Sequence, residues 1–472
     1  MPRHTAAFRG FITPITFICF FCVAALAQQT STPVITALFK FTCNGNLCSN
    51  GFFPKGKLVQ AQNGNFYGAT SSGGTAPGSG GTIFQITPTG VLTTLFSFDA
   101  DSNGHFPNGE TPLGSLVQGP GGFLYGATAL GGKHNAGTVF KISTGGIFRL
   151  LHTFCSLQGC ADGSSPTSLI VGIDHNLYGA TVSGGVANSG TVFRITPRGV
   201  LTTIHSLNGN SDSGSPNALT QASDGNFYAT TDIGPTGLLG TIFRITTSGV
   251  FTTLHDFSSP PDADPMGSLL QASDGNLYGV TLYGEIYQST LAGSFKIIVP
   301  GQFDPIRSGL TQASDGNLWA THQGATNTDP GDVFAVTLAG LQVQNARFSC
   351  TLNGGMPQGV IQATDGKLYG VGTSCVDSSG VQHFGTVFVV DAGLKATESR
   401  FLRFTPTNQN PSKIDEQGNE VRTSNHGFAG PIVMRLTARS SRASAMAGHR
   451  SWALPLSLKS AAVNPVGARS SP

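Results

Sequence analysis

One segment of the chain has acidic and amide side chains at the spacing of a calcium-binding loop. Asp99, Asp101, Asn103 and Glu110 match the first, third, fifth and last ligand positions of the pattern D-x-D-x-N-G-x5-E. Oxygen ligands at this spacing can converge on Ca²⁺, and the glycine permits the sharp bend between them. The pattern therefore predicts a calcium site. The alternative is a simple polar turn, because Asp, Asn and Gly are also common turn residues.

Other acidic side chains could serve catalysis if the fold brought them together. The candidates are Asp99, Asp162, Asp212 and Asp264, each in a polar segment between apolar runs. A pair of carboxylates at one opening would suit a carbohydrate-active hydrolase or lyase. The chain has no zinc-protease helix motif, nucleophile elbow, phosphate loop or dinucleotide fingerprint. His152, His205 and His255 recur at one equivalent position of the repeat described below, which favours packing over metal ligation.

Six cysteines follow the first 27 residues, and we predict that they form three disulfides. Two pairs have members five residues apart in equivalent segments, and the last two cysteines fall in neighbouring loops. Such a separation across a turn suits the ~5.5 Å between the Cα atoms of a disulfide. The predicted pairs are Cys43 with Cys48, Cys155 with Cys160, and Cys350 with Cys375. The alternative is that the third pair stays reduced.

A repeat of about fifty residues contains all these positions. An aromatic ring followed by Gly or Ala recurs seven times, every 41 to 58 residues, and a proline precedes each copy at a nearly constant distance. The rings are Tyr67, Tyr125, Tyr178, Tyr228, Tyr278, Trp319 and Tyr369. Each unit holds four short runs of alternating apolar residues, the pattern of half-buried strands. The sequence therefore predicts an all-β fold, a seven-bladed β-propeller of four-stranded antiparallel blades.

The two ends of the repeat predict how the ring closes. Residues 35–41 resemble the fourth strand of a unit, whereas the last unit stops after its third strand, at Val390. We expect the N-terminal strand to complete the last blade, which leaves no open sheet edge. The alternative is an open solenoid. Dipeptides such as Asp224-Gly225 predict two-residue hairpin turns with positive φ at both positions.

The lengths of the connections predict where a ligand binds. In a propeller blade the first-to-second and third-to-fourth turns share one face, and the remaining loops share the other. The former are short and uniform here, whereas the latter are long and varied. Function concentrates on variable loops that a rigid scaffold positions, so the long loops are the predicted binding face. Plain solvated connections are the alternative for any single loop.

The chain divides into three predicted segments. Residues 1–27 have basic residues, an apolar run and Ala25-Leu26-Ala27, which together predict a signal peptide; a membrane anchor is the alternative. Residues 28–390 form the propeller. Residues 391–472 are rich in Ser, Ala, Arg and Pro and are predicted to be a flexible basic tail, with a disrupted domain as the alternative. Export to the periplasm or the extracellular space would allow the disulfides to persist.

Composition limits the class of partner. Lys and Arg total 26 against 24 Asp and Glu, so the chain has no charge excess for a broad nucleic-acid-binding face. After residue 27 no apolar run is long enough to span a membrane. We expect a monomer with an extracellular ligand, either protein or polysaccharide, and no cofactor other than the predicted calcium.

The repeat consensus, D-G-N-L-Y-G-A-T followed by G-G and G-T-V-F, resembles the GloVer tandem-repeat family. Its members are exported bacterial proteins with varied C-terminal anchors, and no biochemical activity is settled for them. The resemblance implies an exported, propeller-like repeat. It is compatible with a secreted, non-catalytic binding or scaffolding protein, our first hypothesis. The second is a secreted carbohydrate-active hydrolase or lyase whose site is built from loop carboxylates.

Overall fold

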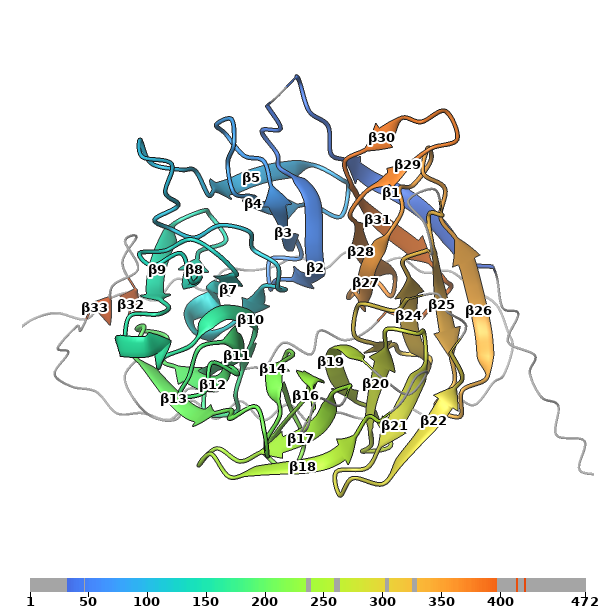
Figure 1. Cartoon of the computed structure of the whole chain (residues 1–472). Coiled ribbons are helices and arrows are strands. Elements are labelled where there is room, and N and C mark those ends of the chain that lie inside the picture. Colours follow the sequence, from blue (N-terminus) through green and yellow to red (C-terminus); the bar gives the residue numbers. More distant parts are fainter. Residues whose placement is uncertain are drawn as a thin grey trace, which may run out of the picture. The chain divides into compact units, whose positions relative to one another are not determined.

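Seven antiparallel sheets surround one axis, as the blades of a β-propeller (Figure 1). The computed structural model describes residues 32–45, 47–234, 239–258, 264–301, 305–324 and 329–396, and the short strands β32 (Lys413–Ile414) and β33 (Glu420–Val421). The predicted signal peptide lies outside the described residues, as does the predicted tail beyond Ala396 apart from these two strands. The predicted fold is confirmed.

The blades are numbered in chain order, and each begins with its innermost strand. Blade 1 contains β2 (Phe52–Gln60), β3 (Phe66–Ser72), β4 (Thr82–Ile86) and β5 (Leu92–Ser97). Blade 2 contains β6 (Val117–Gln118), β7 (Leu124–Thr128), β8 (Thr138–Ile142) and β9 (Phe148–Thr153). Blade 3 contains β10 (Ser164–Val171), β11 (Leu177–Ser183), β12 (Thr191–Ile195) and β13 (Leu201–Ser206).

The remaining blades follow the same plan with local variations. In blade 4 the innermost strand is split into β14 (Gly214–Pro216) and β15 (Thr220–Gln221), followed by β16 (Phe227–Ile233), β17 (Thr241–Ile245) and β18 (Phe251–Asp256). Blade 5 contains β19 (Pro265–Gln271), β20 (Leu277–Thr281), β21 (Ile286–Ser289) and β22 (Phe295–Val299). Blade 6 contains β23 (Thr311–Gln312), β24 (Leu318–His322), β25 (Asp332–Val336) and β26 (Gln342–Arg347). Two short 3₁₀ turns, Pro120–Gly122 and Gln158–Cys160, lie in connections.

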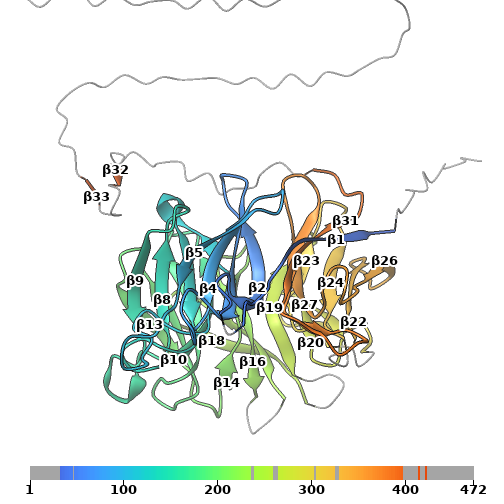
Figure 2. The same ribbon diagram turned by 90° about the horizontal axis from the view of Figure 1, so that it is seen from above.

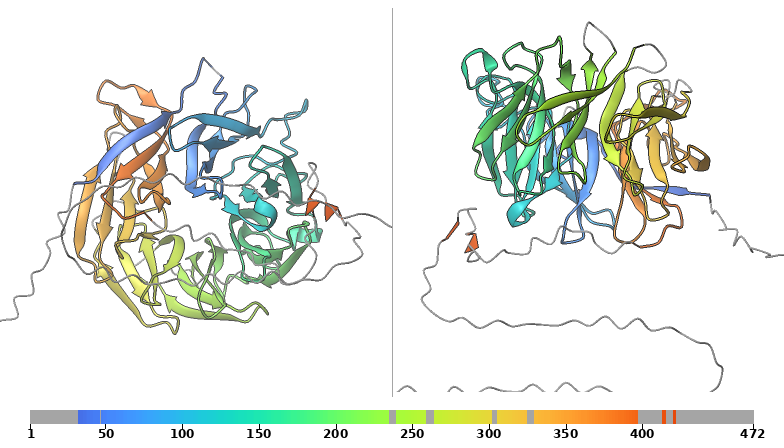
Figure 3. Two further views of the ribbon diagram at one scale, coloured as in Figure 1. Left: turned by 180° about the vertical axis from the view of Figure 1, so that it is seen from behind. Right: turned by 90° about the horizontal axis from the view of Figure 1, so that it is seen from below.

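Blade 7 joins the two ends of the ring. Its own strands are β27 (Pro357–Gln362), β28 (Leu368–Gly372) and β31 (Thr386–Asp391), and a small hairpin, β29 (Cys375–Val376) with β30 (Gln382–His383), projects between β28 and β31. The N-terminal strand β1 (Val34–Lys40) pairs antiparallel with β31, from Val34 opposite Asp391 to Lys40 opposite Thr386. Figures 2 and 3 show β1, in blue, beside the orange strands of this blade. The predicted closure is confirmed.

The recurring motif residues fit one another within each blade. Gly68 in β3 lies opposite Phe84 in β4, and a Cβ atom on this glycine would meet the phenyl ring at 2.6 Å. Two residues along, the hydroxyls of Thr70 and Thr82 are 2.9 Å apart and buried. The same Gly–Phe and Thr–Thr pairs recur in blades 2 and 3. The motif therefore encodes the register of the two central strands.

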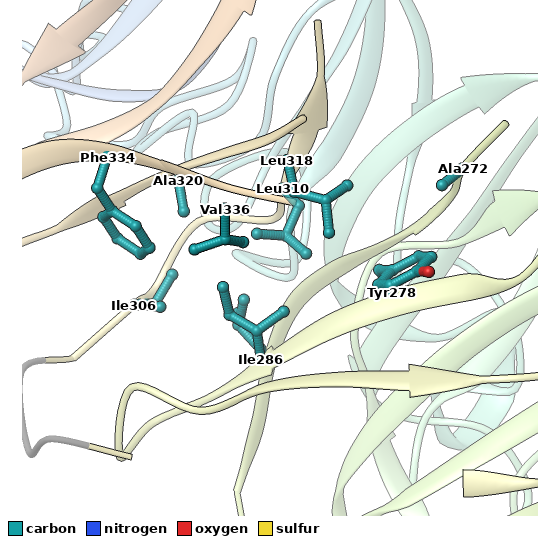
Figure 4. Packing of buried hydrophobic residues seen from close by; sticks show 10 residues of the cluster. Ala272, Tyr278, Ile286, Ile306, Leu310, Leu318, Ala320, Phe334 and Val336 are labelled. Atoms are coloured by element: carbon teal, nitrogen blue, oxygen red, sulfur yellow. The ribbon is translucent and has the colours of Figure 1, made fainter. Parts of the chain in front are cut away.

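Apolar side chains fill the spaces between neighbouring blades. Figure 4 shows one such cluster, in which Tyr278 and Ile286 of blade 5 belong to the same core as Leu318 and Phe334 of blade 6. The seven recurring rings are all nearly fully buried. They act in packing, which agrees with their regular spacing.

The Asp-Gly turns differ from the prediction. Only the glycine has positive φ, 82° at Gly225, whereas Asp224 does not. The amide of Gly225 donates to the carbonyl of Ala222 at 2.9 Å, and the amide of Ala222 donates to the carbonyl of Asn226 at 3.0 Å. The loop thus has three residues, a type I turn followed by a glycine bulge, which needs only one left-handed residue.

The described chain continues past the last strand in contact with the ring. Ala392 is buried and Leu394 packs against the core between blades 6 and 7. The carbonyl of Lys395 accepts hydrogen bonds from Ser314 Oγ at 3.0 Å and from Gln362 Nε2 at 3.3 Å. Contacts with the propeller therefore extend to Lys395, a few residues beyond the predicted boundary at 390.

Candidate functional site

The long connections share one side of the ring, here called the long-loop face. It consists of the loops between the second and third strands of each blade and the loops between blades. All three disulfides lie in these loops: Cys43–Cys48, Cys155–Cys160 and Cys350–Cys375. The Cα atoms within each pair are 4.2, 3.9 and 5.8 Å apart, respectively. The pairing predicted from spacing and strand order is the one that the structure contains, and it fixes loops of this face.

The predicted calcium ligands lie in the loop between blades 1 and 2. Asp99 accepts hydrogen bonds from Ser79 and Ser97, both at 2.5 Å, and from Thr75 at 2.9 Å. Burial raises the pKa of the Asp99 carboxyl, but these hydroxyls outweigh that effect and lower it. The Asp99 carboxylate is therefore hydrogen-bonded to hydroxyl groups of its own blade.

The other predicted ligands make separate contacts. Asp101 accepts the backbone amides of Asn103 at 2.8 Å and of His105 at 2.9 Å, and the backbone of Glu110 pairs with Leu130. Among the described residues, no group of three or more His, Cys, Asp or Glu side chains is placed to hold a metal. Calcium binding at this loop stays a prediction, and it would require Asp99 to release its hydroxyl partners.

Two of the other loop carboxylates pair with histidines of the outermost strands. Asp162 Oδ2 lies 3.0 Å from His152 Nε2, and it also accepts Ser156 Oγ at 2.7 Å and the Ser156 amide at 3.1 Å. Asp212 Oδ2 lies 2.7 Å from His205 Nε2 in the next blade. These pairs hold each between-blade loop to the strand before it, so the histidines have a structural role.

The convergence of loop carboxylates on one opening, which would favour the hydrolase or lyase hypothesis, is not seen for three of the four candidates. Asp99, Asp162 and Asp212 lie at the outermost strands of blades 1, 2 and 3, where strand hydroxyls or imidazoles bind them. The reason is local: a carboxylate that follows a strand by two to nine residues can accept hydrogen bonds from nearby amides and hydroxyls of its own blade. Each of these three acids is held by hydrogen bonds within its own blade.

An acidic pair does occur at the long-loop end of the two inner strands of the blades, here called the inner rim. Asp232, at the end of β16, accepts a hydrogen bond from Asn217 Nδ2 at 2.8 Å, and the same amide group lies 3.2 Å from the carbonyl of Pro265 in blade 5. The side chain of Asp232 is exposed, but the protein atoms around its carboxyl remove part of its hydration. This desolvation raises the pKa of the carboxyl, the Asn217 hydrogen bond lowers it by less, and the charge of Asp264 raises it further.

Sequence reasoning named Asp264 but missed Asp232. The missed signal is positional: Asn217 directly follows the proline that begins its blade, and Asp264 directly precedes the equivalent proline of blade 5. Residues next to these prolines lie close together where the two blades meet, as the hydrogen bond from Asn217 to the Pro265 carbonyl shows. Only the ring places the end of β16 beside them.

The inner rim also has a basic part, formed by Lys55 and Lys57 of blade 1 and Arg307 of blade 6. Lys57 of β2 extends past blade 7 to blade 6, where its Nζ donates to the carbonyl of Leu310 at 2.8 Å and to Thr311 Oγ1 at 3.0 Å. Burial lowers the pKa of Lys57 to about 8. Lys55, two residues nearer the long-loop face, has its pKa lowered by burial and by the charge of Arg307 in blade 6.

The opposite, short-turn face carries a recurring network that stabilises the fold. In blade 4 the hydroxyl of Tyr228 donates to Asp224 Oδ2 at 2.8 Å, and Asp224 also accepts the amide of Asn226. Burial, with the hydrogen bond and charge of Asp224, raises the pKa of Tyr228 to about 12. The same Asp–Tyr bond occurs in blades 3, 5 and 7. These aspartates stabilise the turns of the short-turn face.

The sequence matches one family model twice, over residues 25–161 and 156–300, which together exceed half of the chain. The model describes the Gloeobacter/Verrucomicrobia repeat. The chain belongs to this repeat family. The family predicted from the motif is thereby confirmed, and the two matches together span blades 1 to 5.

Solved structures similar to this repeat protein have mixed functions. Virginiamycin B lyase from Staphylococcus aureus, bound to quinupristin, has 16% identity and a TM-score of 0.51, over 76% of this chain and 99% of that one. A streptogramin B lyase has 16% identity and a TM-score of 0.52, over 76% of this chain and 97% of that one. The extracellular domain of a protein described as a hybrid two-component system of B. thetaiotaomicron has 12% identity and a TM-score of 0.50, over 75% of this chain and 42% of that one. These likenesses show the fold alone.

Two further comparisons bear on this repeat protein. No curated protein sequence matches the chain. Within the described part of the chain, no helix has the length and apolar character needed to cross a membrane.

Proposed function

We propose that this repeat protein is an exported, non-catalytic binding or scaffolding propeller whose extracellular ligand binds on the long-loop face. The observation that supports it is the state of the polar side chains there. Asp99, Asp162 and Asp212 are all committed to hydrogen bonds within their own blades. Groups held in this way shape a surface but are poorly placed to exchange protons with a substrate.

The loops themselves are built as a fixed platform. Disulfides tie three sites on this face, and the His–Asp pairs tie two more. A preorganised surface loses little conformational entropy when a ligand binds, which favours affinity. Disulfides also persist in an oxidising compartment, which supports location outside the cytoplasm.

The test compares binding with turnover. Mature protein is incubated with a panel of neutral and acidic polysaccharides, and bound protein is measured after sedimentation of the insoluble ones and by calorimetry for the soluble ones. We expect binding without release of reducing ends and without the absorbance of unsaturated sugar products. Turnover of a bound polysaccharide would contradict the non-catalytic proposal.

A second candidate function, a carbohydrate-active hydrolase or lyase, is favoured by one observation. Asp232 has a raised pKa beside a second carboxylate, Asp264, and such a group can hold a proton for general acid catalysis. If turnover is found, the variant Asp232→Asn should abolish it while Asp162→Asn acts through stability. Unchanged turnover in Asp232→Asn would exclude this acid.

A further inference from the structure

Within the described residues, the cations of the basic part of the inner rim have no carboxylate partner. Arg307 lies close enough to Lys55 for its charge to add to the effect of burial and lower the pKa of the Lys55 ammonium group. No carboxylate among the described residues lies within ion-pair distance of Lys55, Lys57 or Arg307. Cations brought together inside a ring repel one another, so their arrangement disfavours the free protein unless an anion binds.

The position of these cations is set by close contacts of three blades. Lys57 crosses in front of Gly359 in β27, where an added Cβ atom would meet Lys57 Cε at 3.1 Å and Ser308 Oγ at 2.9 Å. Blades 6, 7 and 1 therefore meet at the level of Lys57. Arg307 precedes Ser308, and Lys55 precedes Lys57 by two residues, so both lie one step closer to the long-loop face. Arg307 is exposed and Lys55 is partly exposed.

Lys57 differs from these two cations in its hydrogen bonds. Its ammonium group is bound to Leu310 and Thr311 of blade 6 and serves to connect blades. The side-chain donors of Lys55 and Arg307 make no hydrogen bond to another described residue. Their donors are thus the ones that a ligand can use.

The surroundings favour one kind of anion. Asp232 and Asp264 of blades 4 and 5 would repel a densely charged polyanion, while they can accept hydrogen bonds from hydroxyl groups. Phe53, two residues before Lys55, is partly exposed and packs edge-on against Phe52 at 4.7 Å. A partly exposed aromatic ring offers an apolar surface against which a sugar ring can pack. A chain with many hydroxyl groups and well-separated carboxylates would suit the cations, the acidic pair and the aromatic ring.

We infer that Lys55 and Arg307 bind the carboxylate of a uronic acid within an acidic extracellular polysaccharide, at the inner rim of the propeller. The inference rests on the proposed binding function and names its ligand class. The guanidinium of Arg307 can bind a carboxylate through two parallel hydrogen bonds, and Lys55 adds a point charge. The hydroxyl groups of the bound sugar then lie toward the acidic pair.

The experiment is calorimetric titration of the mature protein with hexagalacturonate and with an alginate hexamer. Three controls separate the contributions: the fully methyl-esterified galacturonate hexamer, a neutral hexasaccharide and hexaglutamate. The variants are Lys55→Gln, Arg307→Gln and the double variant. Lys133→Gln, which removes an exposed charge from a loop on the same face, is the matched control. Unchanged melting temperatures show that the variants are folded.

We expect a uronate hexamer to bind, the ester and the neutral hexamer to bind at least tenfold more weakly, and added salt to weaken the binding. Each Gln substitution at the rim should weaken uronate binding about tenfold, as the loss of one charge-assisted contact predicts, and Lys133→Gln should not. Equal binding by wild type and double variant would overturn the site. No uronate binding, or equal binding of hexaglutamate, would overturn the ligand class. Binding of neutral polysaccharides alone would overturn this inference and leave the proposed binding function standing.

Discussion

The role of Asp162 gives the sharpest test of whether the loop carboxylates are structural. The substitution Asp162→Asn keeps the shape of the side chain and removes its charge. Oδ2 accepts three hydrogen bonds, from His152 Nε2, Ser156 Oγ and the Ser156 amide, and Oδ1 accepts the Leu157 amide at 3.2 Å. The carboxylate is 1% exposed. An asparagine can replace one oxygen only, and its NH₂ group would then face an amide donor.

The cost can be worked out from these contacts. One buried amide left unsatisfied costs about 1–3 kcal/mol, and hydrogen bonds to a neutral acceptor contribute less than those to a charged one. We therefore expect Asp162→Asn to lower the free energy of unfolding by about 2–4 kcal/mol. The assay is urea unfolding of the disulfide-intact protein, followed by intrinsic fluorescence at neutral pH. Asp101→Asn, in an exposed loop of the same face, is the matched control and should change the midpoint little.

The pH dependence provides a second measurement on the same variant. Burial raises the pKa of Asp162, but hydrogen bonds from Ser156, Leu157 and His152 lower it below the usual 3.8. A carboxyl with a lowered pKa in the folded state contributes stability above its unfolded pKa, and that stability is lost as pH falls through the folded value. The difference between wild type and variant should therefore shrink in acid. An unfolding midpoint equal to that of Asp101→Asn would refute this structural role.

Three further predictions address other parts of the molecule. Because burial lowers the pKa of Lys57 from 10.5 to about 8, the folded protein binds fewer protons than the unfolded chain between these values, so stability should rise with pH across that window relative to Lys57→Met. Each pKa unit corresponds to about 1.4 kcal/mol, and the effect is reduced because water reaches this partly exposed side chain. The free energy of unfolding in urea should therefore rise by about 2 kcal/mol more for wild type than for Lys57→Met between about pH 7.5 and 10.5. Parallel pH curves of the two proteins would contradict this prediction. Calcium titration of metal-stripped protein should release heat and raise the melting temperature, an effect that Asp101→Asn and Glu110→Gln should abolish; no heat and no thermal shift would remove the predicted site. A mature chain that ends at Ala396 should keep the melting temperature of the full mature chain, because the described contacts of the last residues reach Lys395; a loss of several degrees would show that the following residues stabilise the fold.

The architecture could be predicted from sequence because its determinants are local and repeated. The Tyr-Gly and Gly-Thr-Val-Phe segments encode two paired strands, since a glycine such as Gly68 makes room for the phenyl ring of Phe84 directly opposite. Because the pattern occurs seven times, it can be recognised even where a single unit departs from it. The mismatch between the N-terminal strand and the incomplete last unit then determines closure, and strand order brings Cys350 to Cys375.

The site was less predictable, because loop side chains choose among local partners. Asp162 and Asp212 look alike available in the sequence, but each binds amides of its own loop and a histidine of the strand before it. Turn geometry was also decided locally: only Gly225 needs positive φ, because the loop has three residues instead of two.

Contacts across the ring were decided by the tertiary structure alone. Lys57 binds blade 6 and Lys55 lies near Arg307, although more than two hundred residues separate them. The sequence determines which residues follow each blade's proline, while the closed ring brings these positions face to face around one axis. Electrostatic interaction depends on distance through space. The charges of the inner rim therefore interact only in the closed ring, which β1 completes in blade 7.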